Sequence, residues 1–152
     1  MFWYWDFALV AQHKSNWLLI SFAVLTTAIT YAANLFIHEW GHLTGALLTG
    51  SKVYAQPRLF AYALFHFDGK QNNARQFIAM SSGGFVAGAL VIGAIIVFAP
   101  LDSLVAKLAL LVLSLNMIAT IVYEFPETWR VVSGAPVPTG AAFEPFENQA
   151  SC

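Results

Sequence analysis

One short motif in the sequence has residue types and spacing that predict metal chemistry, the HEWGH stretch at residues 38–42. Histidines four residues apart project from one face of a helix, where both imidazoles can bind one zinc ion. The glutamate next to the first histidine is then placed to act as a general base. The motif also arises by chance in soluble proteins, but here it lies within an apolar run over residues 17–48. Ionisable residues in such a run are costly in lipid and usually functional. We therefore predict that His38 and His42 bind Zn²⁺ and that Glu39 is catalytic.

The composition is that of a membrane protein. Of the 152 residues, 59% are hydrophobic and 10% are charged, whereas an ordinary globular domain is about half apolar and a quarter charged. The net charge of −1 argues against nucleic acid as a partner. The single cysteine, Cys152, cannot form an internal disulfide, and its being alone excludes a structural zinc site built from several cysteines. We expect membrane lipid to surround the chain.

Three apolar segments are long enough to cross a bilayer, which takes some 20 helical residues. The predicted helices run from Asn16 or Trp17 to about Thr49, from about Gln76 to Ala99, and from about Leu104 to Phe125. Gly50 is a natural C-cap for the first helix, and Pro100 and Pro126 are expected to end the second and third.

Residues 51–75 break the helical pattern. Two stretches, 53–55 and 59–67, are rich in aromatic and β-favouring residues and predict a short hairpin or a re-entrant segment. His66 lies here and could be a further metal ligand, although an interfacial or strand-face histidine is the favoured interpretation. The predicted fold class is therefore an all-α membrane protein, with three transmembrane helices and a short β-like or re-entrant segment between the first and second.

The two ends of the chain are not expected to span. Residues 1–16 begin with tryptophan and tyrosine, which favour the membrane–water boundary, so we predict an interfacial N-terminal segment. Residues 127–152 are rich in proline and predict a non-spanning tail, either disordered or laid along a partner. No cleavable signal peptide is evident, because the N-terminus lacks a basic region.

Small residues on the first two helices bear on how these helices pack. Gly41 and Gly45 either admit the close approach of a neighbouring helix or are ordinary glycines of a membrane helix, and both interpretations stay open. The second helix carries a small-residue face suited to tight packing, made up of Ser81, Ser82, Gly83, Gly84, Gly88 and Gly93.

A catalytic zinc needs a third protein ligand and an open position for water. Acidic residues are few in this chain, and Glu39 is reserved as the base. With three spans, the end of the third helix lies on the same side of the membrane as the end of the first, and Glu124 is there. We predict that His38, His42 and Glu124 form a His₂Glu site of the thermolysin type.

The chain resembles the site-2 protease family of intramembrane zinc metalloproteases over residues 17–126. That family has an HExGH motif in its first core helix, a β-like segment after it, a second helix rich in small residues, and an NxxPxxxxDG motif in its third helix. Laid on this sequence, the last motif places its asparagine at Asn116 and its metal ligand at Glu124. Ala119, Glu124 and Phe125 replace the proline, aspartate and glycine of that pattern.

The resemblance implies a zinc metalloendopeptidase whose core is residues 17–126 and whose substrates are transmembrane proteins. It implies that Asn116 hydrogen-bonds the substrate backbone or the oxyanion. Because a helix has no free carbonyls, the substrate must unwind locally, and the residue 53–67 strand could pair with it by edge addition.

A second interpretation is a non-catalytic structural subunit of a larger membrane complex that keeps the protease fold. The short chain, the degenerate second motif and the tail favour partner subunits, whereas the retained Glu39 favours the enzyme. A transporter or channel is the weakest interpretation, since no inverted repeat is visible.

The basic residues predict an orientation in the membrane, because cytoplasmic loops carry an excess of lysine and arginine. Five lie on the side of the 50–75 loop and the tail, and two on the other. The first group is Lys52, Arg58, Lys70, Arg75 and Arg130, and the second is Lys14 and Lys107. We predict an integral protein of the inner (plasma) membrane of the cell, with its N-terminus outside and its C-terminus cytoplasmic.

Overall fold

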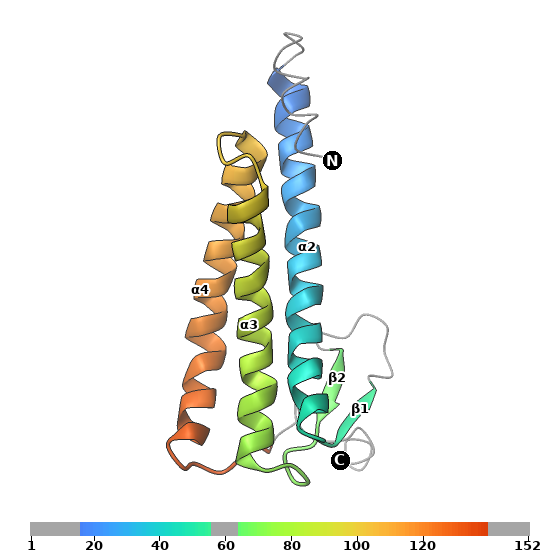
Figure 1. Ribbon diagram of the computed structural model, residues 1–152, viewed down its shortest axis with the longest axis vertical. Helices are drawn as coiled ribbons and strands as arrows, with labels where there is room; N and C mark the ends of the chain where they lie inside the picture. Colours follow the sequence, from blue (N-terminus) through green and yellow to red (C-terminus); the bar gives the residue numbers. More distant parts are fainter. Residues whose placement is uncertain (1–15, 56–63, 140–152) are drawn as a thin grey trace, which may run out of the picture.

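Three long helices and a two-stranded sheet make up the structure, a computed structural model that describes residues 16–55 and 64–139 (Figure 1). The elements, in chain order, are α2 (Asn16–Leu48), β1 (Val53–Ala55), β2 (Phe65–Phe67), α3 (Ala74–Phe98) and α4 (Leu104–Val132). The predicted fold class, with its short β segment between the first two spans, is confirmed. The predictions for the N-terminal segment and for the last part of the tail concern residues that lie outside the described ones.

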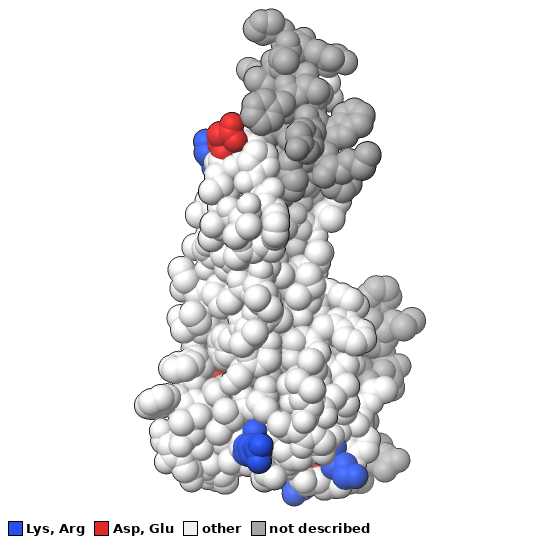
Figure 2. All heavy atoms as spheres, in the orientation of Figure 1, with Lys and Arg blue, Asp and Glu red and all other residues white. Residues whose placement is uncertain are grey.

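All three helices are long and apolar enough to cross a membrane. The shortest, α3, has 25 residues and is about 37 Å long, against a hydrocarbon core of about 30 Å. On the face seen in Figure 2, the lysine and arginine atoms of the described residues lie near the two ends of the helix bundle. Many large apolar side chains between those ends are exposed, including Val24, Leu90 and Val122. This surface fits an integral membrane protein.

Local signals in the sequence set where the helices begin and end. Asn73 is the N-cap of α3 and forms a capping box with Gln76, and Ser103 accepts the Ala106 N–H at the start of α4. After α2, Gly50 adopts φ +64°, which a glycine reaches without steric cost. The side-chain amide of Gln76 also donates to the carbonyls of Thr49 and Gly50, each at 3.2 Å, so it joins the end of α2 to the start of α3.

The prediction that Pro126 ends the third helix is wrong, because α4 continues through it to Val132. Proline has no N–H, so the carbonyl four residues earlier, that of Val122, loses its usual intrahelical donor. Membrane helices tolerate this loss when neighbouring helices and Ser/Thr side chains support the chain nearby. Residues 127–132 therefore belong to the helix, and not to the tail.

Close approach of α2 and α3 explains the glycines of the HEWGH helix. A Cβ atom added at Gly41 would meet the carbonyl oxygen of Gly83, and one added at Gly45 would meet that of Ala79. Backbone therefore packs directly on backbone along this interface. Of the two interpretations left open for Gly41 and Gly45, the structure supports the close approach.

The hairpin and the start of the tail pack together at the end of the bundle where α2 and α4 end and α3 begins (Figure 1). Strands β1 and β2 are antiparallel, with Tyr54 opposite His66. Phe65 and Phe67 of β2 join a buried cluster with Phe77, against which Val137 of the tail is also packed. The first described residues after α4 thus lie along this chain's own hairpin.

Candidate metal centre

His38 and His42 are held by the backbone of the neighbouring helix. The Nδ1 atom of His38 lies 2.9 Å from the carbonyl oxygen of Gly84, and the Nδ1 atom of His42 lies 3.0 Å from that of Met80. A carbonyl oxygen can only accept, so each ring must carry its proton on Nδ1 and donate it to α3. The Nε2 atom of each neutral ring is then an unprotonated acceptor. This arrangement is typical of histidines that bind a metal through Nε2.

The two Nε2 atoms face each other at 3.0 Å. Two lone pairs at that distance repel, unless a cation or a proton lies between or beside them. His38 is only 6% exposed, so water compensates little of that repulsion. The pair is an arrangement of acceptors that a bound cation would stabilise.

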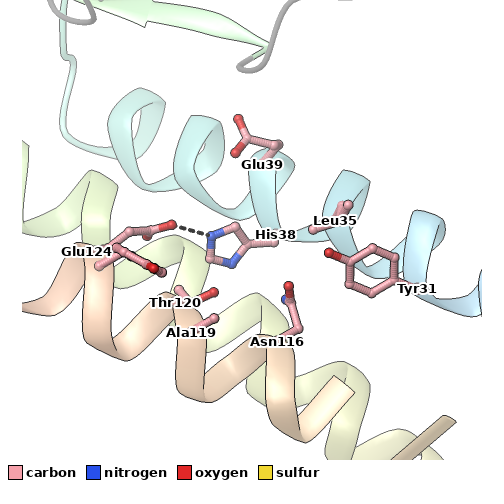
Figure 3. A pocket seen from close by; sticks show the side chains of 9 residues that line it. Tyr31, Leu35, His38, Glu39, Asn116, Ala119, Thr120 and Glu124 are labelled. Atoms are coloured by element: carbon pink, nitrogen blue, oxygen red, sulfur yellow. Dashed lines mark hydrogen bonds and ion pairs between the residues drawn. The ribbon is translucent and has the colours of Figure 1, made fainter. Parts of the chain in front are cut away.

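Glu124 of α4 completes the group. Its Oε1 atom lies 3.4 Å from Nε2 of His38, and its Oε2 atom lies 3.4 Å from Nε2 of His42 (Figure 3 draws the first contact). Ligands of a tetrahedral zinc ion, each about 2.0–2.1 Å from the metal, are about 3.3 Å apart. The three residues predicted as ligands therefore come together with spacings that suit zinc, and their ligand atoms all lie within 4.8 Å of one another.

Two glycines of α3 leave room for the imidazoles. A Cβ atom added at Gly84 would collide with the ring of His42, and one added at Gly88 would lie against Met117 and close to His38. The sequence predicted this small-residue face only as a packing surface. Its second role, admitting two rings against the α3 backbone, was missed because glycine patterns alone do not distinguish a helix neighbour from a side chain.

A cavity of about 320 Å³ adjoins the metal group, between α2 and α4 (Figure 3). Asn116, which the family resemblance implicates in substrate binding, lines it together with Glu39, His38 and Glu124. The remaining lining residues are Tyr31, Leu35, Ala119, Thr120 and Tyr123. No signal in the sequence singled out Tyr31, Thr120 or Tyr123, since single hydroxyl residues are common in membrane helices.

Glu39 lines the cavity but is turned away from the metal group. Its carboxylate points away from the His38 ring in Figure 3 and accepts the backbone N–H of Leu64 at 3.3 Å. Leu64 directly precedes β2, so the predicted base and the hairpin are in contact. In the structure the carboxylate therefore serves the contact with the hairpin and not the metal group.

His66 does not join this group. It is buried in β2, opposite Tyr54 of β1, and within the described part of the chain the clustered ligands are only His38, His42 and Glu124. The interpretation of His66 as a strand-face histidine agrees with this position.

Comparison with known proteins leaves the site to be interpreted by its own chemistry. No family model, no curated protein and no solved structure matches the chain. Two imidazoles and one carboxylate leave a fourth position open on a tetrahedral metal, which is the pattern of catalytic and not of structural zinc sites. A glutamate and an asparagine add a carboxylate and a hydrogen-bonding amide to the lining of the adjoining cavity.

Proposed function

We propose that this protein is an intramembrane zinc metalloprotease of the site-2 type, which hydrolyses peptide bonds of membrane-spanning substrates. The observation that carries the proposal is the convergence of His38 Nε2, His42 Nε2 and the Glu124 carboxylate inside a bundle of membrane-length helices. Both rings are oriented by carbonyls of α3 so that their free nitrogens point to this one place. Ionisable side chains within apolar membrane-length helices are energetically costly, so they are usually kept for a function.

Zinc is the metal that the donor set favours. A bound zinc ion supplies Lewis-acid chemistry, acidifying water and polarising a carbonyl. Two histidines and one carboxylate also suit non-haem iron(II), so the identity of the metal is part of the test. The glutamate directly after His38 favours zinc-dependent hydrolysis over iron chemistry, because in zinc metalloproteases an acid–base residue at that position takes part in peptide cleavage.

Glu39 is the proposed general base. Its carboxylate takes one proton from the attacking water as the carbon–oxygen bond forms, and it returns that proton to the nitrogen as the carbon–nitrogen bond breaks. Catalytic groups are often poorly aligned before substrate binds. This role requires the Glu39 carboxylate to release the Leu64 N–H and to accept a hydrogen bond from the attacking water instead.

Asn116 and the hairpin are proposed to hold the substrate. Asn116 lies eight residues before Glu124 on α4 and lines the same cavity, where its amide can bind a peptide carbonyl or the oxyanion. A substrate helix must unwind to expose a carbonyl. The exposed residues of β1 offer a strand edge that the unwound segment could join. Cleavage that survives proline substitution along that edge would count against strand pairing.

The first test is the metal content of the detergent-purified protein, measured by elemental analysis for wild type, His38→Ala and Glu124→Ala. We expect one zinc per chain in the wild type and loss of that zinc in both variants. Zinc lost only in the histidine variant would remove Glu124 from the ligand set. Iron in place of zinc would redirect the proposal to oxidative chemistry, and a wild type without metal would refute the metal site.

A non-catalytic subunit of a larger membrane complex is the second candidate. The contact between Glu39 and Leu64 favours it, because the residue that a protease needs at the metal instead serves a structural bond. The two candidates differ in a cleavage assay on transmembrane substrates with metal-loaded protein. Cleavage by wild type and not by Glu39→Gln supports the protease, whereas zinc-loaded wild type that cleaves nothing and co-purifies with partner subunits supports the subunit.

The proposed orientation puts the hairpin end in the cytoplasm and the N-terminus outside. Among the described residues, Lys52, Lys70, Arg75 and Arg130 lie at the hairpin end, and Lys107 lies in the first turn of α4 at the other. This asymmetry supports a cytoplasmic hairpin in an inner (plasma) membrane. The orientation is tested with the variants Lys70→Cys and Lys107→Cys, by labelling the introduced cysteine from either side of a sealed vesicle.

A further inference from the structure

A pair of buried hydroxyl side chains joins α3 to the turn of α4 that carries Glu124. Ser81 is 4% exposed and Thr128 is 7% exposed. Their hydroxyl oxygens are hydrogen-bonded to each other across the two helices. The hydroxyl of Thr128 also donates to the backbone carbonyl of Glu124, at 3.1 Å. Nothing in the proposed chemistry uses either hydroxyl, yet the pair ends on the backbone of a metal ligand.

The direction of these hydrogen bonds is fixed by counting protons. A threonine hydroxyl has one proton, and the Glu124 carbonyl can only accept it. Ser81 must therefore donate to Thr128, which in turn donates to Glu124. The chain of bonds runs in one direction, from α3 to the backbone of the ligand.

The bonds lie next to a weak point of α4. Pro126 is two residues after Glu124 and lacks an N–H, so the turn from Val122 to Pro126 has one intrahelical bond fewer than a regular helix. The bond between Thr128 and Glu124 spans the next turn, which overlaps this one, and the bond from Ser81 joins that turn to α3. The pair therefore restrains the segment of α4 whose rotation would move the Glu124 carboxylate.

The same short stretch of α3 also holds a histidine ligand. Met80, which accepts the Nδ1 proton of His42, directly precedes Ser81. Two consecutive residues of α3 are thus linked to ligands of two other helices: the Met80 carbonyl bonds His42 directly, and the Ser81 hydroxyl reaches the Glu124 backbone through Thr128. A helix without a ligand of its own holds both ligands in register.

We propose that Ser81 and Thr128 are positioning residues for Glu124, acting through its backbone to keep its carboxylate beside His38 and His42. This inference rests on the proposed metal site. If the pair only satisfied two buried hydroxyls, its removal would lower the stability of the fold and leave metal binding unchanged. Loss of a partner that orients a metal ligand instead costs about 10–100-fold in metal affinity.

The test compares the detergent-purified wild type with Thr128→Val, Thr128→Ser, Ser81→Ala and the double variant Ser81→Ala/Thr128→Val. The matched control is Thr30→Val, because Thr30 makes the same bond to a carbonyl four residues earlier without reaching another helix. Zinc affinity is measured by competition with a chromophoric chelator. The visible spectrum of the Co²⁺-loaded protein reports the geometry around the metal, and thermal unfolding without metal reports the fold.

We expect Thr128→Val to bind zinc about 10–100-fold more weakly and to change the Co²⁺ spectrum. Thr128→Ser keeps the hydroxyl and should match the wild type, as should Thr30→Val. Ser81→Ala should lose less zinc affinity than Thr128→Val does, because in Ser81→Ala the Thr128 hydroxyl keeps its bond to Glu124. The double variant should be no weaker than Thr128→Val alone, since Ser81 acts only through Thr128.

Wild-type affinity and an unchanged Co²⁺ spectrum in Thr128→Val would overturn the positioning role while leaving the metal site intact. A wild type that binds no metal would instead overturn the metal site, and this inference with it. If Thr128→Val does not fold, Ser81→Ala decides the question. Weaker zinc binding in that variant supports the role, and unchanged affinity and spectrum refute it.

Discussion

The imidazoles of His38 and His42 meet nitrogen to nitrogen, with 3.0 Å between their Nε2 atoms. Each ring is held in this position by a carbonyl of α3, which accepts a hydrogen bond from its Nδ1–H. An arrangement that would be repulsive between neutral rings becomes favourable when a cation binds beside Glu124. The contact would therefore couple the stability of the helix bundle to binding of the proposed metal.

Removal of the metal is expected to destabilise the protein. A ligand that binds only the folded state at 100 times its Kd contributes about 2.7 kcal/mol. Adding a chelator to the wild type should lower its Tm in detergent, and re-addition of zinc should restore it. His38→Ala should show no response to chelator, because it lacks a ligand. An equal chelator response in that variant would mean that the stabilising metal lies elsewhere.

Gly84→Ala is expected to displace His42. The added Cβ would collide with the imidazole, whose Nδ1 is held by the α3 backbone at Met80. We expect zinc affinity to fall by at least about tenfold, as for loss of an orienting partner. Gly93→Ala is the matched control on the same helix, because a Cβ there meets nothing within 4 Å. Equal zinc affinities in the two variants would contradict the structure of the site.

Gly45→Ala is expected to separate α2 from α3. A Cβ atom at this position would meet the carbonyl of Ala79, which belongs to a helix backbone and cannot move aside as a side chain would. Overpacking of this kind costs about 1–3 kcal/mol. The free energy of unfolding in detergent should fall by that amount, whereas Gly93→Ala should leave it unchanged or slightly raised. A stability equal to that of Gly93→Ala would show that the helices are not in backbone contact here.

Glu39→Gln is expected to abolish cleavage while keeping the metal. The glutamine oxygen can still accept the Leu64 N–H, so the contact with the hairpin survives. It cannot accept a proton as a base, and loss of acid–base catalysis costs about 10²–10⁴-fold in rate. Glu127→Gln is the control, since Glu127 pairs with Arg130 at the surface, away from the cavity. Cleavage retained in Glu39→Gln would assign the base to another residue.

Side-chain chemistry was the predictable part of this protein. His38, His42 and Glu124 could be selected because ionisable residues are rare in apolar helices, and because three crossings bring the ends of α2 and α4 to one side. The extents of α2 and α3 also followed from apolar runs, with Gly50 predicted as the C-cap of α2, where the structure gives it a positive φ. These signals are carried by residue type, which a single sequence displays.

Backbone partners and context-dependent breakers could not be predicted. The carbonyls of Met80 and Gly84 orient both rings, but every residue has a carbonyl, so no residue type marks them. Pro126 was predicted to end α4, because that rule describes helices in water. In lipid no water is present to bond the backbone groups that a broken helix would expose, so continuing the helix through the proline costs less than ending it. The rotamer of Glu39 depends on Leu64, a contact between segments 25 residues apart.

Gln76 has a consequence for how the molecule opens. Its amide nitrogen donates to the carbonyls of Thr49 and Gly50, directly after α2, while its amide oxygen accepts the N–H of Asn73 at the start of α3. We therefore expect the two helix ends to fray together, because the same side chain bonds both. In hydrogen exchange, the last turn of α2 and the first turn of α3 are then expected to open as one cooperative unit. The end of the HEWGH helix should then exchange its amide protons at a rate close to that of the start of α3.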